Sequence, residues 1–195
     1  MRAGIISKLI KNEHGEILQA LDLEFCKKLA FYDIKWEILN YFKPDFSRID
    51  MLIISGGNDL KSIISNDINI LRDEFESNCI KYAIENEIPI FGVCKGAQSL
   101  ANFLGACFEK VSTHVGEHEI DFLGDRLTVN SYHNYAIKSI ENAKILASST
   151  DGYIEAFSNE KFKILGAMWH FEREAKPSQA SKKIFEILKG LKWKG

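Results

Sequence analysis

Cys94, His170 and Glu172 are the residues of this 195-residue sequence whose types together could carry out nucleophilic catalysis by a thiolate. Cys94 follows the apolar run 89–93 and precedes a segment with helical spacing that ends at Gly105, the pattern of a strand, a tight turn and a helix. A cysteine at a helix N-terminus lies at the positive end of the helix dipole, which favours the nucleophilic thiolate. The alternative is a buried cysteine that packs at the end of a core strand.

Two glycines, Gly92 and Gly96, stand two positions to either side of Cys94. We expect them to let the backbone turn sharply and to keep bulk away from the sulfur. This arrangement resembles the small residues around the nucleophile in hydrolase elbows.

His170 ends the apolar stretch 164–169, and Glu172 follows two positions later. Thiolate catalysis needs a base that takes and returns a proton, and a third group that orients the base. Side chains two positions apart at a strand end lie on the same side, so we expect Glu172 to fix the imidazole tautomer. For a lone His-x-Glu pattern, a histidine packed against a helix beside a solvated glutamate is the more common case.

Gly56 and Gly57 follow the apolar run 51–54. Because glycine has no side chain, access to their backbone N–H groups is open, as an oxyanion hole requires. The N–H of Lys95 could be a second donor. The alternative is an ordinary strand-to-helix turn. The Gly-x-x-x-x-Gly-Lys-Ser/Thr spacing of a nucleoside triphosphate loop is absent.

The elements that must position these residues alternate in the first half of the chain. Runs 3–7, 34–39, 51–54 and 89–93 predict strands, and segments 17–31 and 68–84 predict helices. Apolar strands alternating with helices predict a parallel sheet covered on both faces, with the site at the strand carboxyl ends. Short strand-like runs after Gly105 predict an antiparallel portion, and 178–190 predicts a last helix.

Composition indicates one globular domain over residues 1–195, with 46% hydrophobic and 27% charged residues. A net charge of −2 disfavours nucleic acid and anionic membranes as partners. Because no signal peptide or membrane-spanning run is recognisable, we expect a cytoplasmic protein without membrane contact. Trp36, Trp169 and Trp193 are expected to be packing or surface residues.

Metal and disulfide sites are not expected. The four cysteines, Cys26, Cys79, Cys94 and Cys107, lack CxxC spacing. His114 and His118 lie in a strand-like region, where four positions span about 13 Å. We therefore expect no metal and no cofactor.

Four motifs in order resemble the class I glutamine amidotransferase-like hydrolases across nearly the whole chain. They are the oxyanion turn Ser55-Gly56-Gly57-Asn58-Asp59, the nucleophile elbow 92–98, the middle motif Val129-Asn130-Ser131-Tyr132-His133 and the His-x-Glu end 166–172. The resemblance implies a three-layer, flavodoxin-like α/β fold with a mostly parallel central sheet and an antiparallel C-terminal portion. It also implies a catalytic triad of Cys94, His170 and Glu172, and an oxyanion hole formed by Gly57 and Lys95.

The same resemblance implies a pocket for a small-molecule gamma-glutamyl amide. Its expected contacts are Gly56, Asn58, Gln98, Ser131, Tyr132, His133 and Lys8. Lys8, Lys11 and Lys95 could meet a pyrophosphate, although a solvated lysine is the default for each. The sequence departs from the family at Met168, Phe171 and Asn134, where glutamine, proline and, in one branch, histidine are usual.

Three functions remain open at this point. The oxyanion and middle motifs look more like the free-standing gamma-glutamyl hydrolases, including those that release a nucleotide-linked amine, and this would require no synthase partner. One alternative is a glutaminase subunit that delivers ammonia to a separate synthase. The other is a non-catalytic binding domain of the same fold, against which the presence of all three triad residues argues.

Overall fold

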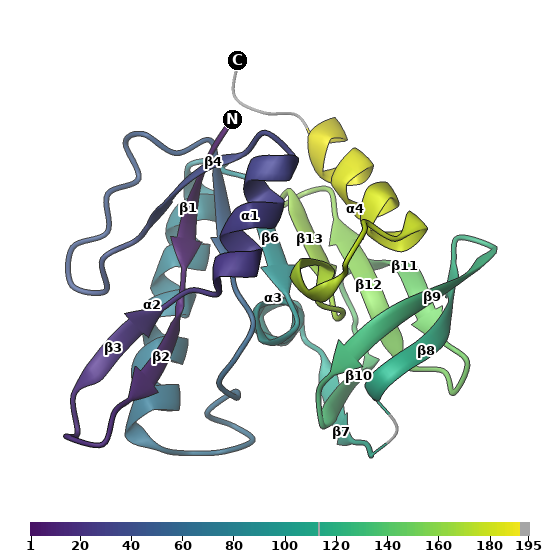
Figure 1. Cartoon of the computed structure of the whole chain (residues 1–195), viewed down its shortest axis with the longest axis horizontal. Helices are drawn as coiled ribbons and strands as arrows, with labels where there is room; N and C mark the ends of the chain where they lie inside the picture. The colour runs from purple at the N-terminus through teal and green to yellow at the C-terminus, as the bar shows by residue number, and fades with distance from the viewer. Residues whose placement is uncertain (113, 192–195) are drawn as a thin grey trace.

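The computed structural model describes residues 1–112 and 114–191. Its central feature is an eleven-stranded sheet with the path β4-β1-β5-β6-β13-β12-β11-β8-β9, to which β10 and β7 are added through β12 (Figure 1). The strands of this sheet are β1 (Arg2–Ile6), β4 (Lys35–Ile38), β5 (Met51–Ile54), β6 (Ile90–Val93), β7 (Cys107–Lys110), β8 (Val115–Phe122), β9 (Asp125–Tyr132), β10 (Tyr135–Ser139), β11 (Lys144–Ser149), β12 (Ile154–Asn159) and β13 (Ile164–Ala167).

Strand direction divides the sheet into two parts. The pairs from β4 through β1, β5 and β6 to β13 are parallel, and those from β13 through β12, β11 and β8 to β9 are antiparallel. This confirms the expected mixed α/β fold. The strand β10, which the sequence pattern did not indicate, pairs antiparallel with β7 and β12.

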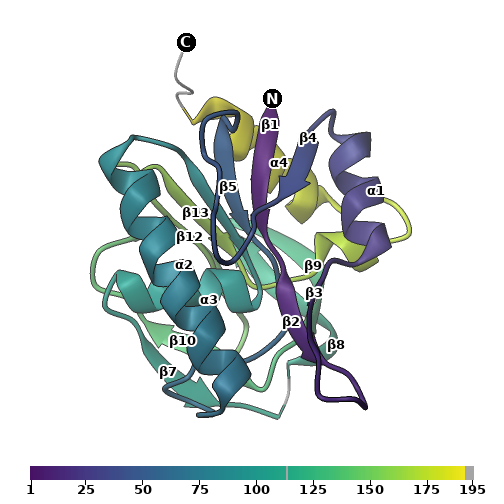
Figure 2. The same ribbon diagram turned by 90° about the vertical axis from the view of Figure 1, so that its left-hand side faces the viewer.

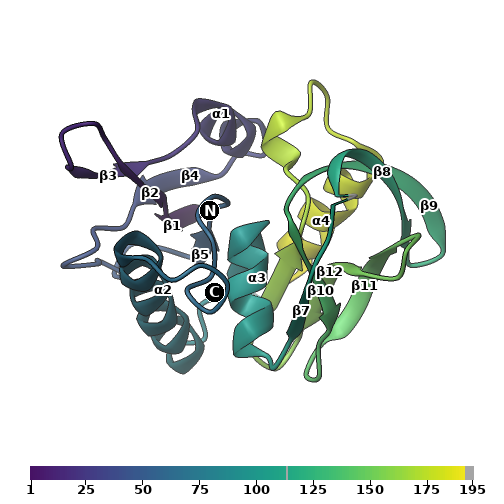
Figure 3. The same ribbon diagram turned by 90° about the horizontal axis from the view of Figure 1, so that it is seen from below.

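Helices cover both faces of the sheet (Figures 2 and 3). On one face, α1 (Leu23–Phe31) and α4 (Gln179–Gly190) bury Leu29 and Phe185 in a hydrophobic cluster with Ile53 of β5. On the other, α2 (Asp67–Glu85) and α3 (Lys95–Phe103) pack Ile80 and Leu100 against the neighbouring strand residue Ile54. Successive side chains of a strand point to opposite faces, so fully apolar strands are needed to fill both clusters.

The helix predicted for residues 17–31 is wrong in its first part. Residues 17–20 form β3 (Ile17–Ala20), which pairs with β2 (Lys8–Lys11) in a two-stranded antiparallel hairpin. The helix begins only after Asp22, whose side chain accepts a 2.9 Å hydrogen bond from the N–H of Glu24 and caps the first turn. Leu18 is 42% exposed, so its apolar character does not mark a core-facing helix position.

The parallel order brings three strand ends together. Ile54 of β5 pairs with Gly92 of β6, and Val93 of β6 pairs with Ala167 of β13. The chain segments that follow these strands therefore leave the same edge of the sheet, where open α/β sheets bind ligands.

Two expectations concern the limits of the structure. Trp193, and the parts of the predicted 1–195 domain at residues 113 and 192–195, lie outside the described residues. Among the described residues, the helices are too short or too polar to cross a membrane.

Candidate active site

Cys94 occupies a strained turn between β6 and α3. Its φ of 51° and ψ of −108° are sparsely populated for a residue with a side chain, as is typical of a nucleophile elbow. The Cys94 N–H donates to the carbonyl of Ala167 at 2.8 Å, and the Cys94 carbonyl accepts from the N–H of Gln98 at 2.9 Å. These bonds hold the turn between the neighbouring strand and the helix it starts.

The flanking glycines have a role in packing that the sequence analysis did not predict. A Cβ on Gly96 would lie 2.1 Å from the carbonyl oxygen of Ile54, and one on Gly92 would lie 2.5 Å from the Gly96 carbonyl oxygen. They therefore permit close backbone packing of α3 on two strands, a role in addition to the expected space around the sulfur.

His170 and Glu172 form a buried pair, with 2.5 Å between His170 Nδ1 and Glu172 Oε1. The sequence analysis expected strand pleating to place the two side chains on the same side. Instead, β13 ends at Ala167 and Glu172 lies in the 3-10 turn Phe171–Arg173. The turn folds the carboxylate back onto the imidazole. In this position the carboxylate can fix the tautomer of the imidazole, as the third member of a catalytic triad does.

Cys94 and His170 are hydrogen-bond partners. Burial lowers the pKa of His170, but the charge of Cys94 and hydrogen bonds to Cys94 and Glu172 outweigh burial and raise that pKa to about 10. The imidazole is therefore protonated at neutral pH. A cysteine sulfur beside a protonated imidazole that a carboxylate supports is an arrangement that can attack a carbonyl carbon and then protonate a leaving amine.

Asn130 is a residue of this site that the sequence analysis did not single out. Its side chain in β9 donates to the His170 carbonyl at 3.0 Å and accepts from the His170 N–H at 2.9 Å. This double contact fixes the backbone of the candidate base. The sequence feature that could have indicated Asn130 is its position in the middle motif, directly before Ser131.

The turn at Gly56 and Gly57 lies against the candidate nucleophile and base. A Cβ on Gly56 would come within 2.9 Å of His170 Cε1 and 3.5 Å of Cys94 Cβ. Gly57 has a φ of 83°, a conformation that glycine adopts at little cost. The N–H of Lys95, at the first position of α3, has no acceptor within its own helix. Both predicted oxyanion donors thus flank Cys94.

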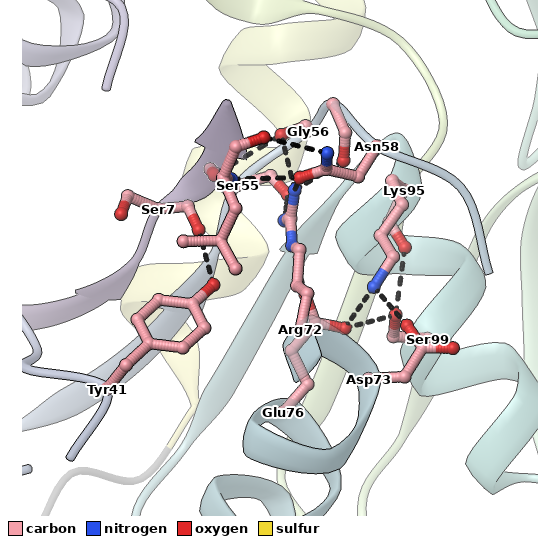
Figure 4. A network of polar contacts seen from close by, with 12 residues as sticks. Ser7, Tyr41, Ser55, Gly56, Asn58, Arg72, Asp73, Glu76, Lys95 and Ser99 are labelled. Carbon is pink, nitrogen blue, oxygen red and sulfur yellow. Dashed lines mark hydrogen bonds and ion pairs between the residues drawn. The ribbon is translucent and has the colours of Figure 1, made fainter. Parts of the chain in front are cut away.

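A buried network of charged side chains joins the two halves of this predicted oxyanion hole (Figure 4). Arg72 of α2 donates to the carbonyls of Ser55 at 2.5 Å and Gly56 at 3.2 Å, and also to the Gly57 carbonyl. Its Nε donates to Glu76 Oε1 at 2.6 Å. Arg72 is fully buried, so these contacts and a 2.9 Å hydrogen bond to Asn58 Oδ1 replace the water that would otherwise solvate it.

Lys95 completes the network from the other side. Its Nζ lies 2.5 Å from Glu76 Oε2 and 2.7 Å from Asp73 Oδ1 (Figure 4). Burial lowers the pKa of Lys95, and although burial raises the pKa of Glu76, Lys95 and Arg72 bring that pKa below its usual range. The Lys95 side chain is therefore committed to these carboxylates, which corrects the idea that it could meet a pyrophosphate.

A pocket of about 130 Å³ opens beside Cys94 and His170. Its lining residues are Gly57, Asn58, Asp59, Cys94, Lys95, Gln98, Tyr132, His133, Asn134, Tyr135, His170 and Arg173. Four of the seven predicted substrate contacts are thus gathered in one place, namely Asn58, Gln98, Tyr132 and His133. Gly56 and Lys8 line a second pocket, whereas Ser131 is fully buried and lines neither.

The predicted substrate residues differ in how their side chains are engaged. The amide of Asn58 makes two 2.9 Å hydrogen bonds to the backbone of Leu9, which ties β2 to the glycine turn. Gln98 donates from Nε2 to the Tyr135 carbonyl at 2.8 Å. The Tyr132 ring lies 5.7 Å from the His170 ring in an edge-on arrangement.

Two cations lie at the site. Lys8 packs its stem on the Gly57 turn, where a Cβ would be 2.9 Å from Lys8 Cδ, and lines a small second pocket with His170, Glu172 and Arg173. Arg173 lines both pockets and stacks its guanidinium 4.2 Å above the Tyr132 ring. The sequence analysis missed Arg173, although it directly follows Glu172.

The departures at Met168 and Phe171 do not shape these pockets. Met168 is fully buried against the cluster under α2 and α3. Phe171 packs against Phe25 and Phe185 with ring centroids 5.1 and 5.0 Å apart. Only Asn134, the third departure, lines the pocket beside Cys94.

Comparison with known proteins places this site in a family. Residues 19–188 match the family described as Glutamine amidotransferase class-I. The chain is 36% identical over 183 residues to the gamma-glutamyl-CDP-amidate hydrolase of Campylobacter jejuni subsp. jejuni serotype O:2, covering 89% of this chain and 91% of that protein. It is 29% identical over 135 residues to a glutamine-hydrolyzing GMP synthase subunit of Archaeoglobus fulgidus, covering 64% of this chain and 67% of that one.

A solved structure supports the fold. A glutamine amidotransferase from Thermotoga maritima superposes with a TM-score of 0.66 and 17% identity, covering 97% of this chain and 82% of that one. The α/β sheet, the match over most of the chain and the 36% identical hydrolase lead to one conclusion. The chain belongs to the class I glutamine amidotransferase family and is related to amide hydrolases.

Proposed function

We propose that this protein is a cytoplasmic, cysteine-dependent amidohydrolase that cleaves gamma-glutamyl-CDP-amidate to glutamate and cytidine diphosphoramidate, in modification of a capsule polysaccharide. The observation that carries the chemistry is the pairing of Cys94, in its strained elbow, with His170 and Glu172. The nature of the leaving group rests on the 36% identical hydrolase.

The reaction follows from the positions of these groups. The Cys94 thiolate attacks the gamma-carbonyl carbon of the glutamyl group, and the carbonyl oxygen becomes an oxyanion held by the N–H groups of Gly57 and Lys95. His170 gives its proton to the leaving nitrogen as the C–N bond breaks, which leaves a glutamyl thioester. His170 then takes a proton from water, the hydroxide attacks the thioester, and glutamate and the thiolate are released.

Specificity must come from the leaving group, because every gamma-glutamyl amide shares the same acyl part. Besides Lys95, whose ammonium is held by Asp73 and Glu76, the cations that line the pockets beside the triad are Lys8 and Arg173. We assign the pyrophosphate of the substrate to them, in place of Lys95. Binding energy from this remote part is useful when it is expressed in the transition state, where it raises kcat/KM.

The test compares kcat/KM for gamma-glutamyl-CDP-amidate and for glutamine. We expect a preference of about a thousandfold, equivalent to about 4 kcal/mol. Arg173→Gln and Lys8→Gln should each lower kcat/KM for the nucleotide substrate by about tenfold or more and leave that for glutamine nearly unchanged. High salt should weaken the preference, because these cations act partly through screened charge. Equal kcat/KM for both substrates would contradict the proposal.

A glutaminase subunit is the second candidate, favoured by the similarity to the GMP synthase chain of Archaeoglobus fulgidus. This function predicts activity on free glutamine that rises sharply when a synthase partner is added. Pull-down from the source cell, followed by glutaminase assay of the complex, separates the two. The non-catalytic alternative predicts no glutamate release from either substrate.

A further inference from the structure

Behind the pocket wall, four ionisable side chains from separate parts of the antiparallel sheet converge. His114 precedes β8, His118 lies in β8, His133 follows β9 and Glu155 lies in β12. Glu155 is fully buried, His114 and His133 are 2% and 5% exposed, and His118 is half-buried. None of their side chains takes part in the triad.

The ring nitrogens of all three histidines point at one carboxylate oxygen. Glu155 Oε1 lies 3.0 Å from His114 Nδ1, 3.4 Å from His118 Nε2 and 3.7 Å from His133 Nε2. Ligand atoms of His114, His133 and Glu155 all lie within 4.8 Å of one another. Four ligands at the usual zinc bond lengths, arranged tetrahedrally, are separated by about 3.3 Å, so small side-chain movements would place an ion between these atoms.

Several polar atoms of this cluster lack a hydrogen-bond partner. Of the ten buried side-chain nitrogen and oxygen atoms in the described part of the chain that lack a hydrogen-bond partner, seven belong to these four residues. Such atoms are costly unless a partner satisfies them, and each one calls for an explanation. An ion at the point where they converge would satisfy one atom of each residue at once.

Protonation alone explains the cluster less well. The His114 and His118 rings are stacked with centroids 4.7 Å apart, and the His133 ring lies 4.9 Å from that of His114. Several imidazolium charges at these distances would repel one another, and Glu155 is the buried carboxylate, among the residues that the structure describes, that faces all three rings. Neutral imidazoles, in contrast, are the form that binds transition metals.

The second nitrogen of His114 is placed as in known metal sites. His114 Nε2 lies 3.2 Å from both carboxylate oxygens of Asp151, while Nδ1 faces Glu155. A metal-binding histidine commonly gives its other N–H to a carboxylate, which orients the ring and increases its basicity.

We propose that His114, His118, His133 and Glu155 bind one divalent transition-metal ion, with Zn²⁺ as the best match to three nitrogen ligands and one oxygen ligand. Four protein ligands leave no open position, so the ion would be structural. It would tie β8, the end of β9 and β12 together. Because His133 directly follows Tyr132 and also lines the pocket, the ion would hold one wall of the candidate active site.

This proposal differs from the expectation of no metal. That expectation assumed an extended strand from His114 to His118, which would separate them by about 13 Å. His114 instead lies before β8, and Gly116 between them has a φ of 108°, so the chain does not run straight. The remaining ligands come from distant segments that spacing in the sequence does not reveal.

The test is Zn²⁺ binding by the full chain without a histidine tag, carrying Cys94→Ala so that the thiolate and His170 cannot form a competing site. After EDTA treatment and dialysis, we expect calorimetric titration to give one Zn²⁺ per chain and a Tm that is higher with Zn²⁺ than with EDTA. Co²⁺ in place of Zn²⁺ should produce the visible absorption of a tetrahedral site with nitrogen and oxygen ligands.

Variants locate the ion. Glu155→Gln and His118→Asn should each weaken Zn²⁺ binding by about 100-fold or more, whereas His14→Ala, which removes a histidine with a 73% exposed side chain, should leave it unchanged. If Glu155→Gln fails to fold, His118→Asn decides, since its side chain is only half-buried. A protein that binds no Zn²⁺, or equal affinity in the folded Glu155 or His118 variant, would overturn the proposal.

Discussion

Replacing Arg72 should separate its role in catalysis from its role in stability. Arg72 donates to five oxygen acceptors, namely those of Ser55, Gly56, Gly57, Asn58 and Glu76. Three of these are the carbonyls of the turn whose N–H at Gly57 we assign to the oxyanion hole. Arg72→Met would remove every donor and leave Glu76 with only part of its counter-charge, whereas Arg72→Lys would keep the charge and lose the planar fork of donors.

The magnitudes follow from the burial of these groups. Removing one partner of a buried ion pair costs about 3–5 kcal/mol, a large part of the roughly 5–15 kcal/mol that stabilises a protein. We therefore expect Arg72→Met to fold poorly. For Arg72→Lys we expect a loss of about 2 kcal/mol, which lowers Tm by roughly 4–8 °C at this chain size.

The catalytic effect of Arg72→Lys should appear in kcat. The substrate pocket is lined by other side chains, but the turn loses its fixed position, and a misplacement near 1 Å can cost about 100-fold in rate. We expect kcat to fall about 10- to 100-fold with KM changed less than about threefold. Arg48→Lys, at an exposed arginine, is the matched control and should change neither constant.

The assay is steady-state glutamate release, with Tm measured on the same preparations. A folded Arg72→Lys protein with wild-type kcat would refute the positioning role and leave Arg72 as a stability residue only. A rise in KM at constant kcat would also contradict the argument, because it would show that Arg72 acts through substrate binding.

The remaining predictions concern the triad. Cys94→Ala should lower glutamate release by about 10⁴-fold or more while circular dichroism stays native, and residual turnover near wild type would exclude Cys94 as nucleophile. His170→Ala should lower glutamate release nearly as much as Cys94→Ala. Glu172→Gln should lower it by about 10²- to 10⁴-fold, since the carboxylate orients the base. If neither substitution lowered glutamate release, the triad assignment would be wrong. At pH 6, iodoacetamide should alkylate Cys94 before the exposed Cys107, as peptide mapping by mass spectrometry would show, because the protonated His170 stabilises a negative sulfur. His170 has a pKa of about 10 in the folded chain against 6.5 for the free side chain, so its stabilising contribution is complete below pH 6.5 and is lost as pH rises through about 10. Denaturant titrations across this range should show that loss, and Cys94→Ala should flatten it.

The central chemistry could be predicted because it is encoded in short stretches of sequence. The run that ends at Cys94, the glycine pair at 56 and 57, and the His-x-Glu pattern at 170–172 each combine a buried strand with the turn that directly follows it. In a parallel sheet those turns must meet at one edge, so strand order alone brings them together. The mixed α/β fold followed from the same periodicity, with an error at residues 17–20, where exposed apolar side chains imitated a helix.

Only the tertiary structure decided how side chains from distant segments pair. Lys95 carries a charge that looked available to a substrate, but packing of α2 on α3 places Asp73 and Glu76 against it. His114 and Glu155 lie 41 positions apart in sequence and meet because β11 and β12 return the chain beside β8. Once packing buries such groups, each one needs its partner, because a buried charge without a partner is costly. Sequence spacing records local geometry, and it contains no signal for contacts that packing creates.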